Sequence, residues 1–477
     1  MLFAQLSRIK RDAPWQLPLF IAQRSGCGVG RIEIENIEGL IAGLKDEPSW
    51  RDQSSISAVS EWILLGWKYI VDNAERLDQD LVDSKTTISH FTSFATAWAR
   101  LTRDLAAGLE KFQNALRPTI SQIIKILWVT SAVARLDHPN FKPFNQFSVQ
   151  ALSNLNTLNP LSIAHTWPLL ILCEDRQSIL LRLLYTKNNR LLLIIGVLIL
   201  NCVHHNPERI ESLINSDVGQ KAMTMMLERL DGLLDDETEV VFEVIVKLVR
   251  EIVDLEPVTQ VPKLYHSQAT PSQVLSPGQL SILKVLESST VLPSASFLLE
   301  QFKQFSTHLD EAWQGFVLVI EILVKRIEET IATSSATGLP VELIMSDAEI
   351  LSVVEISIRI LKEFSEKRSE LRASKDDQQG SDKKRSVNQI LIGLIKLLTN
   401  LIALKNEDDP KQDTPGSTFI QDAVRNLDGF PIILIFTLFD VDFPYLREHS
   451  IVLIKFLLKN NPKNQELIKN LQPILPS

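Results

Sequence analysis

Two adjacent histidines, His204 and His205, are the residues of this sequence whose types best suit metal binding. Imidazole nitrogens are common ligands of Zn²⁺, and a site needs three or four ligands that converge on one point. Neighbouring residues of a helix point about 100° apart, and no cysteine, aspartate or glutamate at a ligand spacing supports the pair convincingly. We therefore predict no metal site, and expect both histidines at a helix end near exposed carbonyl groups.

Three glycines at alternate positions mark the stretch SGCGVGR, residues 25–31, and raise the question of a phosphate-binding loop. A P-loop needs Gly-Lys followed by Ser or Thr, and a dinucleotide site needs a strand before the loop and a helix after it. The stretch has neither feature, so we interpret it as a turn before a helix. Cys27 lies within it, but only Arg24 and Arg31 are near enough in sequence to activate a thiolate.

Motifs of known catalytic centres are absent from the sequence. It contains no HExxH, no Gly-x-Ser-x-Gly, no CxxC and no pair of carboxylates in a recognisable catalytic context. We therefore predict no catalytic residues, no cofactor and no enzymatic activity.

The net charge bears on the kind of partner that the protein can bind, and the cysteines bear on its cellular compartment. The chain has 49 basic and 58 acidic residues, a net charge of −9, whereas nucleic-acid binding requires a concentrated basic surface. Cys27, Cys173 and Cys202 are odd in number and far apart, as expected of reduced intracellular thiols. We predict protein partners rather than nucleic acid, and a cytoplasmic location.

The most apolar stretches are residues 191–200 and 430–439, and each spans about ten residues. A membrane-spanning helix needs roughly 20 apolar residues, so we interpret both stretches as buried helices and predict no membrane association. The N-terminus also lacks an apolar segment followed by a small-residue cleavage site, so we expect no secretory signal.

Helical periodicity runs through most of the chain. In the segment 54–77, for example, apolar residues recur at the i, i+3, i+4 and i+7 spacing of one helix face. Glycine is scarce, at 17 of 477 residues, which disfavours a sheet with many tight turns. The sequence predicts an all-α fold.

An internal repeat appears when Asn188–Leu213 is laid over Phe443–Ile468. In both copies a long apolar helix is followed by Asn-Pro, at Asn206 and Asn461, and then by a second helix. Asparagine is a good N-cap, and proline suits the first helical position, where no backbone donor is needed. A third, partial copy at 387–409 lacks the Asn-Pro. Such repeats are typical of helical solenoids.

Polar and proline-containing stretches divide the chain. We predict N-terminal helical repeats over 1–253, a proline-containing loop over 254–279, central repeats over 280–364, a polar loop over 365–388 and a C-terminal domain over 389–477. Within this last domain, Asp428 and Asp442 are predicted to cap helices.

The C-terminal stretch resembles the ataxin-10 family, an armadillo-like group. The resemblance rests on Leu427-Asp428-Gly429 with Pro431, on Asp440-Val441-Asp442, on Pro444 to Glu448 and on Asn460 to Gln465, and it covers about residues 389–471. The family has Trp where this chain has His449. The resemblance implies a right-handed armadillo/HEAT-like solenoid, a non-catalytic scaffold for other proteins and a role in cytokinesis.

Asn201 and Asn400 are the candidate binding residues. In armadillo repeats an asparagine late in the third helix often bonds the backbone of a bound peptide, and the repeat overlay places these two residues there, with Phe456 in the C-terminal copy. The simpler interpretation is that they bond neighbouring backbone. Two alternatives to a general scaffold therefore stay open: a transport or assembly adaptor that binds peptides along these asparagines, and a regulatory subunit of an enzyme complex.

Overall fold

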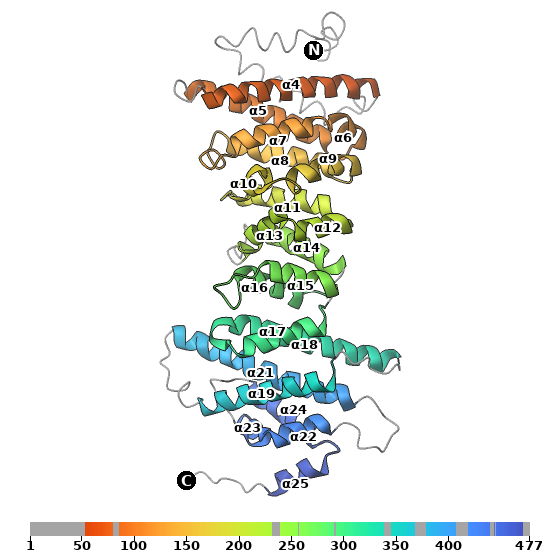
Figure 1. Cartoon of the computed structure of the whole chain (residues 1–477), viewed down its shortest axis with the longest axis vertical. Coiled ribbons are helices and arrows are strands. Elements are labelled where there is room, and N and C mark those ends of the chain that lie inside the picture. Colours follow the sequence, from red (N-terminus) through yellow and green to blue (C-terminus); the bar gives the residue numbers. More distant parts are fainter. Residues whose placement is uncertain are drawn as a thin grey trace, which may run out of the picture. The chain divides into compact units, whose positions relative to one another are not determined.

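The computed structural model describes residues 53–79, 85–230, 239–255, 257–290, 292–337, 345–367, 378–406, 418–438, 443 and 445–470. Every regular element in these ranges is a helix, and no strand occurs among them, which confirms the all-α prediction. The chain divides into two compact units, Met1–Leu255 and Glu256–Ser477. Figure 1 shows the helices of each unit lying in successive layers.

The described part of the first unit consists of α-helices that range from 6 to 27 residues in length. They are α4 (Gln53–Gln79), α5 (Lys85–Ala106), α6 (Glu110–Leu116), α7 (Thr119–Thr130), α8 (Lys142–Asn156), α9 (Pro160–Leu170), α10 (Ile179–Leu184), α11 (Asn189–Val203), α12 (Pro207–Asn215), α13 (Asp217–Leu227) and α14 (Glu239–Leu255). Helices α5, α8, α11 and α14 pack one on the next and form a row, which we call the first row. A second row consists of α4, α7, α10 and α13.

The second unit repeats this arrangement in its C-terminal part. Its helices are α15 (Pro257–Ser267), α16 (Pro277–Glu287), α17 (Ala295–Ser306), α18 (Leu309–Thr337), α19 (Asp347–Glu366), α21 (Gln378–Asn406), α22 (Phe419–Asn426), α23 (Gly429–Ile435), α24 (Leu446–Leu458) and α25 (Pro462–Asn470). Here α18, α21 and α24 form the row that corresponds to the first row of the other unit.

Apolar faces hold each row together. On α11, Leu191, Ile195 and Leu198 are fully or almost fully buried, because α8 packs on one side of the helix and α14 on the other. On α24, one face of the helix is buried. Leu446, Ser450, Leu453 and Leu457 are buried. A helix of this kind is stabilised mainly by its buried face and much less by its intrinsic propensity.

One helix, Lys384–Leu404 within α21, is long and apolar enough to cross a membrane, by length and composition alone, among the residues that the structure describes. Buried core helices share this property, and 61% of its most apolar window is buried inside the protein. The stretches 191–200 and 430–439 do not form such a helix: the first lies within α11, and α23 ends at Ile435.

The predicted loop at 254–279 was wrong over much of its length, because α15 occupies Pro257–Ser267. Pro257 stands at the first position of this helix, where its missing N–H leaves no bond unmade. Pro262 lies inside the helix and removes one backbone donor, which a helix tolerates at a cost. Pro257 therefore begins a helix and does not lie in a loop.

The polar segment 365–388 also differs from the prediction. Helix α21 begins at Gln378, so the second half of this segment is helical, and residues 368–377 lie outside the described ranges. Asp428 precedes α23 with φ of 56°, and its side chain makes no capping bond. An N-cap residue normally has extended backbone, whereas Asp428 is left-handed, so the predicted cap at this position is wrong. The predicted cap at Asp442 lies outside the described residues.

Candidate functional site

The ends of four row helices share one backbone conformation. In each case the second residue after the helix has a left-handed backbone conformation, and the next helix begins two residues later. These residues are Gly108 (φ 73°), Leu158 (φ 55°), His205 (φ 52°) and Asn460 (φ 54°), after α5, α8, α11 and α24. The recurrence places the same turn at corresponding edges of successive repeats.

Asparagine caps follow three of these turns. The side chain of Asn206 accepts a hydrogen bond from the backbone N–H of Arg209, and that of Asn461 accepts one from Asn464. The predicted Asn-Pro caps are therefore confirmed. Asn159, followed by Pro160, caps α9 through the backbone N–H of Ser162 in the same way. The repeat thus has a further copy that the sequence overlay missed.

Asn201 lies third from the end of α11, on the first row, and is half-buried. Its amide Nδ2 donates to the carbonyl oxygen of Ser153 at 3.3 Å, to the hydroxyl of Ser153 at 3.2 Å and to the hydroxyl of Thr157 at 3.0 Å. The amide therefore joins α11 to the end of α8, as the simpler interpretation of this residue expects.

Asn154 occupies the equivalent position, third from the end of α8, and was not predicted. Its Nδ2 donates to the carbonyl oxygen of Arg103 on α5 at 2.9 Å. Asn154 and Asn201 therefore make the same contact one repeat apart. The signal that could have found Asn154 is the pair Asn159-Pro160, which stands the same distance after it as Asn206-Pro207 stands after Asn201.

Asn400 lies on α21 in the second unit, half-buried, and its Nδ2 donates to a carboxylate oxygen of Glu328 on α18 at 2.9 Å. The structure thus places Asn201 and Asn400 on equivalent rows of separate units. In both cases a side chain reaches back to the preceding helix of its row. The contact partners differ. Asn201 donates to a backbone carbonyl and to hydroxyl groups, whereas Asn400 donates to a carboxylate.

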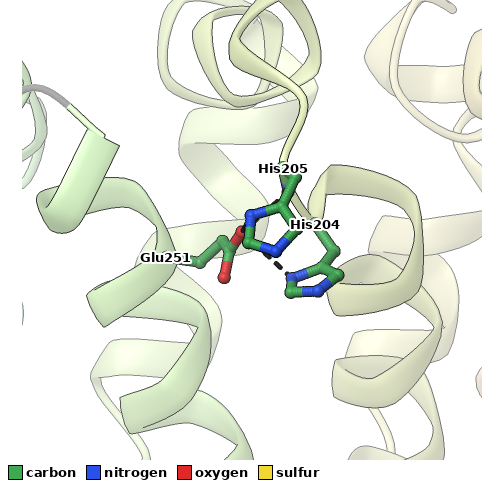
Figure 2. A group of neighbouring side chains, drawn as sticks. All are labelled: His204, His205 and Glu251. Atoms are coloured by element: carbon green, nitrogen blue, oxygen red, sulfur yellow. Dashed lines mark hydrogen bonds and ion pairs between the residues drawn. The ribbon is translucent and has the colours of Figure 1, made fainter.

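His204 and His205 meet Glu251 of α14 (Figure 2). Nδ1 of His204 lies 3.1 Å from Oε1 of Glu251, and Nδ1 of His205 lies 3.6 Å from the same oxygen. The two imidazole centroids are 3.8 Å apart. The premise that these neighbours diverge was wrong, because α11 ends at Val203 and the left-handed turn at His205 brings its ring back beside His204.

Glu251 is held in place by the turn itself. The backbone N–H of His205 donates to Oε1 at 2.7 Å. Burial raises the pKa of this carboxyl, but the hydrogen bonds from the His205 backbone and the His204 ring outweigh burial, so the pKa lies below its usual value. The carboxylate is therefore ionised at neutral pH. Its position, 46 residues after His205, explains why no local spacing pointed to it.

Helix α9 presents an apolar surface to solvent. Apart from Ser162, His165 and Thr166, all of its residues are apolar. Four leucines on or beside it are exposed: Leu158 at 86%, Leu161 at 57%, Leu169 at 37% and Leu172 at 60%. We call these four residues the α9 surface. A helix that is apolar all round is normally buried on all sides.

Helices α6 and α12 precede α7 and α13 as α9 precedes α10, but neither exposes a large apolar side chain, and both expose charged residues. They are Glu110 and Lys111 on α6, and Glu208 and Glu211 on α12. Trp167 of α9 donates from Nε1 to the hydroxyl of Ser212 on α12 at 2.9 Å, so α9 and α12 are neighbours. The apolar side chains of the α9 surface are thus a departure from the pattern of its own repeat.

Of the remaining candidates, the structure describes Cys202 but not the glycine stretch. The glycine stretch 25–31 and Cys27 lie outside the described residues. Cys202 is fully buried, which raises the pKa of its thiol to about 12. At neutral pH that thiol is protonated and shielded from reagents.

The last helices of the chain form a compact polar network of their own. Arg425 of α22 donates from Nη1 to Oδ1 of Asp422 at 2.6 Å and to Oδ1 of Asn464 at 2.7 Å. These residues lie in the segment 416–475, which matches the model of the spinocerebellar ataxia type 10 protein domain. The C-terminus of this chain carries an ataxin-10 domain.

Similar proteins support the same conclusion for this segment. The ataxin-10 homolog of Saccharomyces cerevisiae is 49% identical over 53 residues, which is 11% of this chain and 9% of the relative. The ataxin-10 homolog of Debaryomyces hansenii is 40% identical over 57 residues, 12% of each chain. That of Dictyostelium discoideum is 38% identical over 81 residues, 17% of this chain and 11% of the relative. The resemblance to the ataxin-10 family is confirmed there, and the match spans about a tenth of the relatives' length.

Proposed function

We propose that the chain is a non-catalytic cytoplasmic scaffold with an armadillo-like solenoid fold, which binds another protein and acts in cytokinesis. The ataxin-10 domain supports the family assignment, and cytokinesis enters through the family alone. An armadillo repeat consists of three helices. The triplet α22–α23–α24 and the row formed by the third helix of successive triplets favour this type of solenoid.

The observation that carries protein binding is the α9 surface. Exposed apolar patches bordered by polar residues mark interaction sites in soluble proteins. Leu158 adds to the argument because a leucine in left-handed backbone costs about 1–2 kcal/mol. The backbone of Leu158 is strained, and its side chain is 86% exposed. Packing within its own chain therefore does not offset this strain.

The occupant we propose is an amphipathic helix of a partner protein, with leucine-type residues on one face and lysine or arginine at its edge. The apolar face would cover the leucines of the α9 surface, as in helix-in-groove recognition. The basic edge would lie over α12, whose exposed Glu208 and Glu211 form an acidic border beside α9. Charge complementarity of this kind sets orientation and association rate more than affinity.

A photo-crosslinking experiment tests this proposal. A photoreactive amino acid replaces Leu169 in the full chain, the chain is expressed in dividing cells, and the crosslinked peptides are sequenced. We expect crosslinks to an apolar segment of a different protein that carries basic residues. The control replaces Glu110, an exposed residue at the start of α6, and should not capture that segment.

Three outcomes would reject this occupant. Crosslinks from position 169 to residues 1–52 would mean that the chain covers its own surface. Crosslinks to a second copy would mean self-association, and equal capture from positions 169 and 110 would mean that the α9 surface has no special role.

A separate experiment tests the proposed role in cytokinesis. Cells whose own protein is replaced by the triple variant Leu161→Gln, Leu169→Gln, Leu172→Gln should accumulate with two nuclei. The variant Glu110→Gln, Lys111→Gln should divide normally. If both populations divide alike, the α9 surface does not serve division.

An adaptor that binds peptides along Asn201 and Asn400 is a second candidate. The three hydrogen bonds already made by the amide of Asn201 count against it, because a bound peptide would have to displace them. The double variant Asn201→Ala, Asn400→Ala should therefore retain its protein partners in affinity purification. A regulatory subunit of an enzyme complex is a third candidate, and an activity present in the purified complex but absent from the isolated chain would favour it.

A further inference from the structure

His204, His205 and Glu251 bring three ligand atoms within 4.8 Å of one another, two from the end of α11 and one from α14. The cluster lies at the surface, since the side chain of His205 is 82% exposed and that of His204 is 45% exposed. Glu251 is more enclosed, at 16%. An ion could therefore enter from solvent and meet a carboxylate whose position is already fixed.

The spacing of these atoms suits a tetrahedral ion. Zn²⁺ binds imidazole nitrogen and carboxylate oxygen at about 2.0–2.2 Å, so two ligand atoms of a tetrahedral site lie about 3.3 Å apart. The two Nδ1 atoms lie 3.1 and 3.6 Å from Oε1 of Glu251. All three ligand atoms lie within 4.8 Å of one another, and the two imidazole rings that must turn toward a shared ion are exposed.

The supporting contacts also match what a metal site requires. Ligand carboxylates are usually oriented by a hydrogen bond from a second group, and the backbone N–H of His205 supplies one to Glu251 at 2.7 Å. Two imidazoles and one carboxylate favour Zn²⁺ over Mg²⁺ or Ca²⁺, which prefer oxygen ligands.

We propose that His204, His205 and Glu251 form a Zn²⁺ site that joins the end of α11 to α14. With three protein ligands the ion keeps a fourth position for water. Bound there, Zn²⁺ ties two successive helices of the first row. The site would stabilise this part of the repeat without any role in binding through the α9 surface.

Calorimetric titration with Zn²⁺ tests the site, using the full chain without added histidine tags. We expect one equivalent bound by the wild type, and affinity weakened about tenfold or more in His205→Gly and in Glu251→Gln. Glycine is chosen at position 205 because Gly108 has the same left-handed backbone after α5. Glutamine at position 251 can still accept the backbone hydrogen bond. His138→Ala, another exposed histidine, is the matched control and should bind as the wild type does.

Two further readouts separate a specific site from loose surface binding. Co²⁺ in the same site should give the intense visible absorption of tetrahedral coordination, and His205→Gly should abolish it. Zn²⁺ should also raise the melting temperature of the wild type and leave that of His205→Gly unchanged. Equal Zn²⁺ binding by the wild type, His205→Gly and Glu251→Gln would overturn the proposal, as would the absence of stoichiometric binding to the wild type.

Discussion

Gln421 of α22 and the cap residue Asn461 form a bridge between three helices. Nδ2 of Asn461 donates to Oε1 of Gln421 at 3.3 Å, and Nε2 of Gln421 donates to the carbonyl oxygens of Phe456 and Lys459 at 2.7 and 2.9 Å. One buried amide thus satisfies the carbonyls at the end of α24 and holds the cap of α25. Such carbonyls have no partner within their own helix.

The first unit contains the same bridge. Nδ2 of Asn159 donates to Oε1 of Gln113 at 3.2 Å, and Gln113 donates to the carbonyl oxygens of Asn154 and Thr157 at 2.8 and 3.1 Å. Each glutamine lies on a short helix, and each asparagine caps the short helix of the next repeat. The bridge is therefore a feature of the repeat itself, and it occurs in the ataxin-10 domain as one example.

Gln421→Ala should lower the free energy of opening of the last helices by about 1–3 kcal/mol, because it leaves buried carbonyl groups without a donor. Hydrogen exchange of the α24 and α25 amides measures this loss. Gln465→Ala is the control, since Gln465 makes one exposed bond to the carbonyl of Leu458 and should change exchange by less than about 0.5 kcal/mol. Equal effects of the two substitutions would mean that the bridge adds nothing.

The left-handed turn predicts opposite effects for two substitutions. Leu158→Asn should stabilise the first unit by about 0.5–1 kcal/mol, because asparagine tolerates this backbone and leucine does not. Asn460→Leu should destabilise the second unit by a similar amount. Hydrogen exchange around each turn is the measurement. If both changes destabilise, side-chain contacts rather than backbone strain decide the outcome at this position.

The sequence could predict what depends on neighbours along the chain. A cap joins a side chain to a backbone N–H three residues away, so Asn206 and Asn461 could be identified from the Asn-Pro pairs alone. The burial of Leu453 and the helical nature of the described part of the chain follow from the period of the apolar residues. The family could be predicted because its C-terminal motif is long and ordered, and the match to residues 416–475 confirms it.

The features that the sequence could not predict arise from contacts between helices that are distant along the chain. Glu251 comes from the next helix of the row, so no spacing near His204 could indicate it. The ring of His205 was misplaced because a left-handed residue other than glycine or asparagine has no sequence signature. Pro257 was taken for a loop residue because proline suits both a loop and the first turn of a helix, and only packing decides between them.

Leu453→Ala should destabilise the C-terminal end by about 2–5 kcal/mol, because Leu453 is fully buried on α24 and alanine leaves a cavity. In a stack of repeats each layer depends on its neighbours, so exchange protection should fall first in α22–α25. Val452→Ala is the control, since its side chain is 44% exposed. Uniform loss of protection through both compact units would contradict this local effect.

The last prediction concerns acid and Asp422. Burial raises the pKa of this carboxyl, but hydrogen bonds from Asn461 and Arg425 and the charges of Arg425 and Lys463 outweigh it, so the pKa lies below its usual value. A carboxyl of lowered pKa stabilises the fold at every pH above its unfolded pKa of about 3.9, and this contribution disappears as the pH falls through the folded value. Asp422→Asn removes the charge at all pH values.

Hydrogen exchange of α22–α25 in the wild type and in Asp422→Asn should therefore differ by a constant amount above about pH 5, and the difference should shrink below the unfolded pKa of about 3.9. Both proteins carry Arg425 and Lys463, so other acid effects cancel in the comparison. Glu466→Gln, on the exposed side of α25, serves as the control and should follow the wild type. A difference that stays constant far below that pH would mean that Asp422 stabilises this segment through its shape and hydrogen bonds rather than through its charge.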